Sequence, residues 1–148
     1  MELNENYIYI GLFLTEKSKA KIIERLSEYK EIISHSDNTY LSHCTLLHRS
    51  QENQNKSVIE GLLSLENHYP NGNFPMVATH IGLIEDKVMA IKVELGNNIP
   101  CANNTPHITL CTWGNSKPVE SNNITEWKEI PRCTLSSNLK VISKSIKK

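Results

Sequence analysis

The 148-residue chain has no excess of charge of either sign, since 16 Lys and Arg residues balance 16 Asp and Glu residues. Domains that bind nucleic acid through bulk electrostatics carry a large basic excess, so the composition disfavours that class and allows at most a local anion site. The four cysteines, at positions 44, 101, 111 and 133, form no CxxC pair. Their spacing suits neither a zinc knuckle nor a redox dithiol, and it predicts free thiols in a reducing compartment.

Long apolar runs are missing as well. The run Tyr7–Leu14 is too short to span a bilayer, and no basic segment precedes it as in a secretory signal. No linker or low-complexity tract divides the chain, and 39% hydrophobic residues are enough to close a core. We therefore expect a single domain over residues 1–148, in the cytoplasm and without a membrane partner.

The apolar periodicity predicts an α+β chain in which strands and helices alternate before a run of strands. Strands are predicted at residues 7–14, 40–48, 76–85, 88–95, 107–113 and 139–142, and helices at 16–33 and 58–65. Thr15 is a candidate N-cap for the first helix. A hairpin is expected to turn at Asp86 and Lys87, and a helical turn is expected within residues 116–127.

Two of the predicted strands begin with the same four-residue pattern. His43–Leu46 reads HCTL and His107–Leu110 reads HITL. With six His, nine Thr and 15 Leu in the chain, composition alone predicts about 0.04 occurrences of His-x-Thr-Leu. The repetition indicates an internal duplication in which each half contributes one strand to a shared centre.

Side chains alternate along a strand, so His43 and Thr45 share one face, as do His107 and Thr109. If the two strands are neighbours near a pseudo-twofold axis, two imidazoles and two hydroxyls converge on one cleft. Two imidazoles can hold one neutral base and one charged acid near neutral pH. Threonine hydroxyls can donate hydrogen bonds to phosphate oxygens. This set predicts opening of a phosphodiester without a metal, and neither HExxH nor Cys/His spacing supplies further zinc ligands.

The paired motifs resemble the signature of the 2H phosphoesterase superfamily, and within it the cyclic phosphodiesterase domain of fungal and plant tRNA ligases. Four segments between about residues 40 and 125 carry the resemblance: HCTLLHR (His43–Arg49), DKVMAIKV (Asp86–Val93), PHITL (Pro106–Leu110) and KPVESN (Lys117–Asn122). Such a set of matched segments is more specific than the histidine pattern alone.

The resemblance implies a bilobal α+β fold, with two small antiparallel sheets and flanking helices related by a pseudo-twofold. It implies that His43 and His107 are the catalytic pair and that Thr45 and Thr109 bind phosphate, with no metal or other cofactor. The implied reaction is hydrolysis of an RNA 2′,3′-cyclic phosphate to a 2′-phosphate. The family's full-length ligases also carry ligase and kinase modules, and this chain has no GxxxxGK[ST] loop. An RNA ligase and a kinase acting in trans are therefore the expected partners.

Three other functions stay open. A 2H enzyme of this size could cleave small cyclic nucleotide or oligonucleotide signals. The cleft could also belong to a non-catalytic module that binds RNA ends, although both complete motifs argue against this. In the third alternative, the two histidines are ordinary structural residues of an α+β domain.

Further residues near the motifs have two readings each. Arg49 is a candidate phosphate contact or a solvated charge, while Trp113 and Tyr9 are candidate substrate contacts or packed aromatics. Strict alternation predicts that Trp113 shares a face with His107. It also places His48 on the face opposite His43, which favours a structural role for His48. His80, in the predicted hairpin, is expected to be packed with a hydrogen bond.

Overall fold

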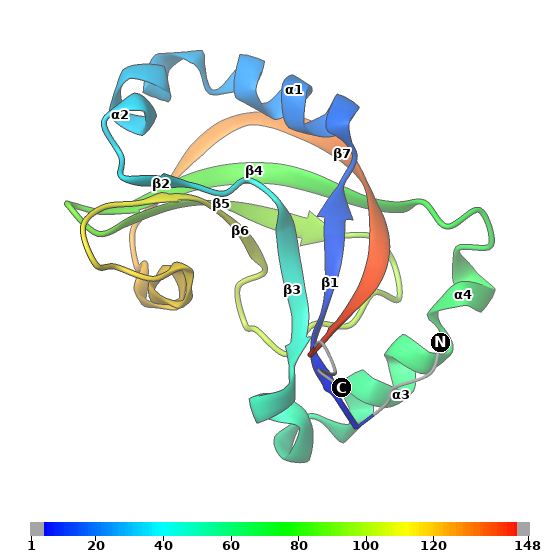
Figure 1. The fold of residues 1–148 in the computed structure, drawn as a ribbon. Coiled ribbons are helices and arrows are strands. Elements are labelled where there is room, and N and C mark those ends of the chain that lie inside the picture. Colours follow the sequence, from blue (N-terminus) through cyan, green and yellow to red (C-terminus); the bar gives the residue numbers. More distant parts are fainter. Residues whose placement is uncertain (1–4, 145–148) are drawn as a thin grey trace.

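Seven antiparallel strands curve into one barrel in the computed structural model, which describes residues 5–144 except the side chain of Glu66 (Figure 1). The strands are β1 (Tyr7–Leu14), β2 (Asn38–Thr39), β3 (His43–His48), β4 (Phe74–Ile84), β5 (Val88–Leu95), β6 (His107–Thr112) and β7 (Trp127–Ser143). Their order is β2-β6-β3-β1-β7-β4-β5, and pairing of β5 with β6 closes the barrel. The predicted α+β class is confirmed.

Short helical segments connect the strands. They are α1 (Glu16–Arg25), η1 (Ser27–Tyr29), α2 (Lys30–Ser34), η2 (Arg49–Gln54), α3 (Lys56–Leu63), α4 (Leu65–His68) and η3 (Pro118–Asn123), where η marks a 3-10 helix. The predicted helix 16–33 is therefore divided into three pieces. Thr15 caps α1 as predicted, because its Oγ1 accepts a hydrogen bond from the backbone N–H of Ser18 at 3.2 Å.

The expectation of two separate small sheets is wrong, because β7 joins the two halves of the chain. This strand pairs with β1 through residues 137–143 and with β4 through residues 127–137. The sequence predicted only residues 139–142 of it. Its outer face is polar and exposed, and its inward positions include Cys133 and Ser137, so the apolar alternation is weak.

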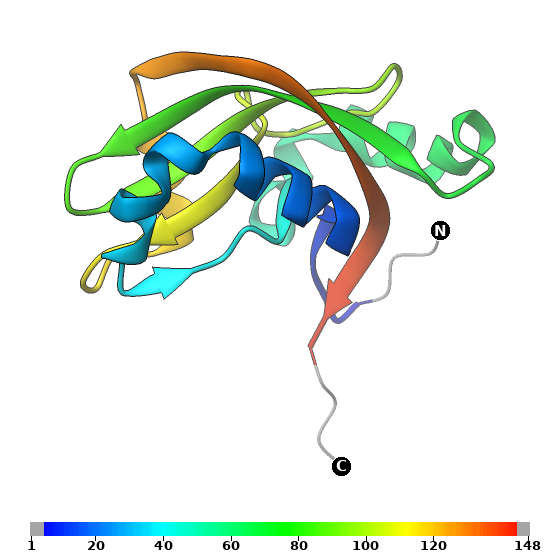
Figure 2. The same ribbon diagram turned by 90° about the horizontal axis from the view of Figure 1, so that it is seen from above.

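The main core lies inside the barrel and beneath α1. Ile10 and Leu12 of β1 and Ile91 of β5 are fully buried in it. Helix α1 lies across β7 (Figure 2), where the Ser18 hydroxyl accepts a hydrogen bond from the N–H of Ser136 at 2.7 Å. Burial of Ile22 in the same core explains why this face of α1 is apolar. The barrel thereby holds β3 and β6, which carry the repeated motifs, on a rigid scaffold.

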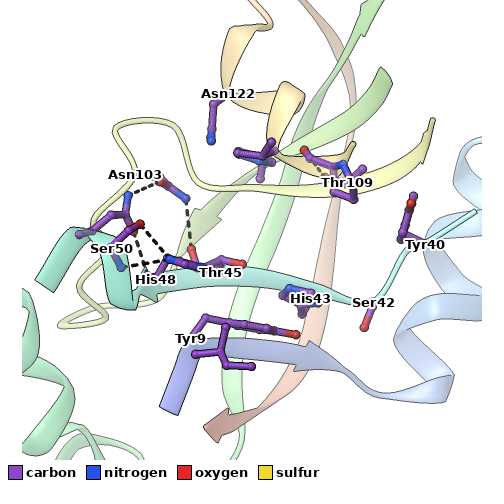
Figure 3. A pocket seen from close by; sticks show the side chains of 15 residues that line it. Tyr9, Tyr40, Ser42, His43, Thr45, His48, Ser50, Asn103, Thr109 and Asn122 are labelled. Carbon is purple, nitrogen blue, oxygen red and sulfur yellow. Dashed lines mark hydrogen bonds between the residues drawn. The ribbon is translucent and has the colours of Figure 1, made fainter. Parts of the chain in front are cut away.

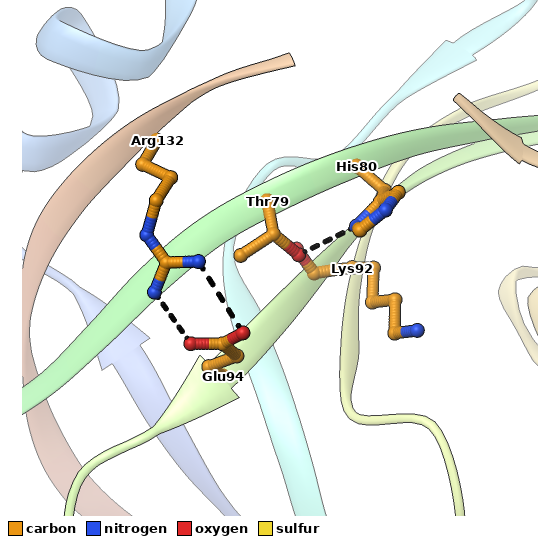
Figure 4. Close-up of polar contacts among 5 residues, drawn as sticks. All are labelled: Thr79, His80, Lys92, Glu94 and Arg132. Carbon is orange, nitrogen blue, oxygen red and sulfur yellow. Dashed lines mark hydrogen bonds and ion pairs between the residues drawn. The ribbon is translucent and has the colours of Figure 1, made fainter. Parts of the chain in front are cut away.

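The hairpin of β4 and β5 turns at Asp86, which has a left-handed backbone with φ of 60°. On its outer face, Arg132 of β7 forms an ion pair with Glu94 of β5 at 2.6 Å (Figure 4). Both side chains are more than half exposed, so the pair contributes little to stability. The His80 Nδ1 lies 2.8 Å from the Thr79 Oγ1, which confirms the predicted hydrogen bond.

All four cysteines are free thiols, as predicted. Cys44, Cys111 and Cys133 are buried and Cys101 is partly buried. Over residues 5–144, each helix is too short or too polar to cross a lipid bilayer.

Candidate active site

The two repeated motifs lie side by side. Cys44 of β3 pairs with Ile108 of β6 in antiparallel register. Both side chains are fully buried in the main core. The residues on either side of them therefore face outward, away from the core. Because antiparallel partners have a constant sum of residue numbers, this register sets His43 opposite Thr109 and Thr45 opposite His107.

Each motif contains the same irregularity. In β3, Gly11 pairs with Thr45 and Ile10 pairs with Leu47, so no residue of β1 pairs with Leu46. In β6, partners of β5 pair with Thr109 and Cys111, and Leu110 is passed over in the same way. A residue without a partner is the mark of a β-bulge, and it shifts the alternation of the side chains by one.

The backbone before each motif binds to the other motif. The N–H groups of Tyr40 and Leu41 donate to the carbonyls of Leu110 and Thr109 at 2.8 and 2.9 Å. In return, the Ala102 N–H donates to the Leu46 carbonyl at 2.8 Å. Leu41 has a φ of 48°, a strained conformation for a leucine that turns the chain into β3. These reciprocal backbone bonds tie the segment that precedes each motif to the other motif, and they add to the pairing of β3 with β6.

A pocket of about 550 Å³ covers the outward face of both motifs (Figure 3). Its volume falls within the usual range for small-molecule sites. The pocket is lined by both motif histidines, both motif threonines and the residues Ile8, Tyr9, Tyr40, Ser42, His48, Ser50, Gln51, Asn103, Pro118, Val119 and Asn122. The structure therefore brings His43, Thr45, His107, Thr109 and the candidate contact Tyr9 together.

Aromatic rings hold the imidazole of His43. Its ring stacks on Phe13 with centroids 4.6 Å apart and on Tyr9 with centroids 5.0 Å apart. Gly11 provides the room, because a Cβ there would lie 3.3 Å from the His43 Cδ2 and 3.1 Å from the Cys44 carbonyl oxygen. The His43 Nδ1 is buried and has no hydrogen-bond partner among the described residues. Burial, and then the nearby His107, lower the pKa of His43.

A backbone carbonyl holds the imidazole of His107. The His107 Nδ1 lies 2.9 Å from the carbonyl oxygen of Thr105. Because a carbonyl only accepts, Nδ1 carries a proton and the Nε2 of the neutral ring is left as the acceptor. Burial lowers the pKa of His107, and the bond to Thr105 opposes this effect. Burial therefore favours the neutral form of both imidazoles.

The two threonines differ in their surroundings. The Thr109 Oγ1 lies 2.9 Å from the Oγ of Ser121, a buried residue of η3. No hydrogen bond is found for the Thr45 hydroxyl among residues 5–144, and the Thr45 carbonyl oxygen accepts a hydrogen bond from the Asn103 Nδ2 at 3.4 Å. Thr45 can therefore offer its hydroxyl to a ligand directly. The Thr109 hydroxyl also donates a hydrogen bond to the carbonyl oxygen of Pro118 at 3.4 Å, so a phosphate oxygen would have to replace this long bond.

Arg49 does not reach the pocket. Its guanidinium donates to the carbonyl oxygens of Glu5 and Tyr7 and lies 5.3 Å from the centroid of the Tyr7 ring. The adjacent Glu52 accepts a hydrogen bond from the Tyr7 hydroxyl at 2.7 Å. Burial and this carboxylate raise the pKa of Tyr7 to about 12. Arg49 and Glu52 thus anchor η2 to the start of β1.

Trp113 does not line the pocket either. The prediction that it shares a face with His107 assumed strict alternation, which the bulge at Leu110 breaks. Thr112 therefore follows Thr109 on that face, and Trp113 packs against the main core.

The bulge also corrects the prediction for His48. Leu46 and Leu47 are both fully buried, so His48 returns to the face of His43 and lines the pocket. The pocket residues Gln51, Asn103 and Asn122 were not predicted from the sequence, since they lie on segments outside the strands. The bulge at Leu46 arises from the pairing of β3 with β1, so the β3 sequence alone does not define it. The only signal in the sequence is the pair of adjacent leucines in LLH.

The described part of the chain contains no cluster of three or more His, Cys, Asp or Glu side chains arranged as a metal site. The polar groups in the pocket are imidazoles, hydroxyls and amides. Together they can accept a proton, donate a proton and hold an anion through hydrogen bonds.

Comparisons with known proteins identify a family and a shared fold. The model of a family described as the fungal tRNA ligase phosphodiesterase domain matches residues 12–142, which is most of the chain and confirms the resemblance seen in the motifs. A solved structure titled "Crystal Structure of Fungal RNA Kinase" superposes with a TM-score of 0.65 at 19% sequence identity. The match covers 97% of this chain and 47% of that chain, so this chain spans about half the length of that structure. This likeness shows a shared fold. A comparison with curated proteins found no significant match.

Proposed function

The chain belongs to the family of fungal tRNA ligase phosphodiesterase domains, and we propose that it opens RNA 2′,3′-cyclic phosphate ends to 2′-phosphates without a metal. One observation carries this proposal. The antiparallel register of β3 and β6 sets two His-x-Thr motifs against each other on one face, within a single pocket. Two imidazoles and two hydroxyls therefore line one pocket, which supports their assignment as acid, base and phosphate-binding groups.

In the proposed reaction, the oxygen of a water molecule attacks phosphorus while one imidazole takes a proton from that water. The bond from phosphorus to the 3′ oxygen breaks, and the other imidazole donates its proton to that oxygen. The 2′ bond stays intact, so the product is a 2′-phosphate with a free 3′ hydroxyl. The transfer needs one neutral and one protonated ring, and burial lowers the pKa of each histidine, which favours the neutral form that a base requires.

We assign Thr45 and Thr109 to the non-bridging phosphate oxygens. Negative charge grows on these oxygens as water attacks, so hydroxyl donors fixed in place stabilise the transition state. Thr109 is held by Ser121, which makes Ser121 a positioning residue. The strand pairing places one threonine opposite each histidine, and a phosphate between the strands could then meet all four groups.

RNA is the proposed substrate, and sealing its ends would need further activities. Opening the cyclic phosphate leaves a 2′-phosphate and does not join strands. We propose an RNA ligase and a 5′ kinase as the activities that would supply the sealing reaction.

The test uses an RNA oligonucleotide that ends in a 2′,3′-cyclic phosphate, with excess EDTA present. Wild type is compared with His43→Gln and His107→Gln, and His35→Gln serves as a control at an exposed histidine outside the pocket. Loss of a general acid or base is expected to lower kcat/KM by about 10²- to 10⁴-fold. Circular dichroism and urea unfolding verify that each variant is folded.

The identity of the product decides between alternatives. A 2′-phosphate made in EDTA, and lost in both pocket variants, supports the proposal. A 3′-phosphate would preserve the two-histidine chemistry and reverse the leaving group. Binding without turnover would favour a module that recognises RNA ends. Turnover of small cyclic nucleotides alone would favour a signalling substrate.

A further inference from the structure

The pocket extends past the first motif at the C-terminal end of β3. At this end, the bulge in β3 turns His48 into the pocket, followed by Ser50 and Gln51 of η2. At the corresponding position of the second motif, Thr112 is fully buried and pairs with β2. We call the open side, formed by His48, Ser50, Gln51 and Asn103, the His48 end.

A chain of hydrogen bonds holds the His48 end in place. The His48 backbone N–H donates to the Gln51 Oε1 at 2.9 Å, and the Gln51 Nε2 donates to the Asn103 Oδ1 at 3.0 Å. The Asn103 Nδ2 in turn donates to the carbonyl oxygen of Thr45 at 3.4 Å (Figure 3). This chain runs from η2 to the phosphate-binding motif, so the amides are fixed before any ligand arrives.

The same groups retain donors and acceptors for a ligand. Each amide nitrogen has two hydrogens and uses one of them in the chain. The His48 Nδ1 accepts a hydrogen bond from the Ser50 N–H at 3.1 Å, so the Nε2 of the neutral ring carries the proton. The His48 end therefore presents N–H donors and an amide oxygen with a spare lone pair.

The charge of the pocket identifies the chemistry that this end recognises. Among the fifteen lining residues in the described chain, there is no Lys, Arg, Asp or Glu. A second phosphate would favour Arg or Lys, whereas base edges and ribose hydroxyls are matched by amides, hydroxyls and imidazoles. Recognition at this end is thus by neutral hydrogen bonds.

We propose that the His48 end is a subsite for the terminal nucleoside, the one whose ribose carries the cyclic phosphate. This proposal rests on the proposed function, since the phosphate must lie between the two motifs. The nucleoside would then contact His48, Gln51 and Asn103, and the rest of the RNA would lie outside the pocket. A nucleoside 2′,3′-cyclic monophosphate therefore contains most of what the pocket binds.

The experiment compares two substrates that share a five-membered cyclic phosphate. One is a nucleoside 2′,3′-cyclic monophosphate and the other is glycerol 1,2-cyclic phosphate, which has no nucleoside. The variants are His48→Asn, which retains an N-cap for η2 but removes the ring, and Asn103→Ala. His35→Asn is the matched control at an exposed histidine far from the pocket lining.

Each pocket variant is expected to raise KM for the nucleoside substrate about three- to tenfold, the size of one net hydrogen bond, with kcat retained. KM for glycerol cyclic phosphate should not change. An equal loss on both substrates, or no loss on either, would overturn the subsite. If wild type turns over neither substrate and also fails to open the RNA oligonucleotide, the proposed function fails on its own. Calorimetry with a nucleoside 2′-monophosphate and inorganic phosphate then decides: weaker binding of only the nucleotide in the variants supports the subsite, and unchanged binding refutes it.

Discussion

The two His-x-Thr motifs have the same strand geometry, but different residues surround their histidines. Both have a β-bulge at the leucine, and both bury the residue between histidine and threonine. Yet His43 is held by stacked rings with a bare Nδ1, whereas His107 is held by a carbonyl. The repeated sequence therefore gives the two histidines equivalent positions on their strands. Their protonation depends on neighbours that differ between the two motifs.

The difference bears on how each imidazole can act. A carbonyl partner selects one tautomer of His107 and leaves Nε2 as the reactive nitrogen. Stacked rings restrict the plane of His43 and exclude water, and they select no tautomer. The first motif also opens into the His48 end, while Thr112, which takes the position of His48 in the second motif, is fully buried beside β2. Two segments of nearly identical sequence can therefore contribute unequally to substrate binding and to proton transfer.

The largest expected effect separates the two threonines. Thr45→Val and Thr109→Val each remove one hydroxyl donor to the phosphate and should lower kcat about 10²-fold. Only Thr109→Val leaves the buried Ser121 hydroxyl without this partner, so it should also cost about 1–3 kcal/mol of unfolding free energy. Kinetics with the cyclic phosphate and urea unfolding measure the two effects.

Ser121→Ala is the control for that difference. It removes the partner of Thr109 and leaves the hydroxyl that meets the phosphate, so kcat should fall less than in Thr109→Val. Equal stability of Thr45→Val and Thr109→Val would contradict the tie between Thr109 and Ser121.

A smaller effect is expected from opening the aromatic cover of His43. Phe13→Ala should let water reach the ring and weaken the desolvation that lowers the pKa of His43, so this pKa should rise toward its ordinary value. The limb of the kcat/KM profile that depends on His43 should then move to higher pH, whether His43 is acid or base.

The pH profile has a defined sign in wild type. Burial lowers the pKa of both histidines, so the singly protonated pair is lost as pH rises above these lowered pKa values and kcat/KM should fall on that side of the profile. Thr105→Ala is the matched control, because it retains the carbonyl that binds His107 and should leave the profile in place. An unshifted profile in Phe13→Ala would rule out the proposed effect of the aromatic cover.

The smallest effect concerns Trp113. Because the bulge turns it toward the main core, Trp113→Phe should leave KM and kcat within about twofold of wild type while lowering the urea midpoint. If KM for RNA ends rises without a loss of stability, Trp113 contacts the substrate and this prediction is wrong. Arg49→Lys offers a second check, since its guanidinium anchors η2 at Tyr7 outside the pocket.

Much of the scaffold was readable from local patterns. The bounds of β1 and β5 were predicted to the residue, because their apolar residues and flanking turns are unambiguous. The 17-residue β7 was mostly missed, since its inward face contains Cys133 and Ser137 and its outward face is charged. The break between α1 and α2 was missed too, because apolar spacing continues through it.

The sequence by itself determined which groups meet. A histidine and a threonine two residues apart on a strand must share a face, and the doubled motif implied that both pairs serve one centre. Tertiary structure decided what lies beside them. Bulges at Leu46 and Leu110 arise from pairing with β1 and β5, and they brought His48 into the pocket and turned Trp113 away. The alternation of residues along one strand does not predict a bulge. A bulge is a mismatch between two paired strands, and the second strand lies elsewhere in the chain.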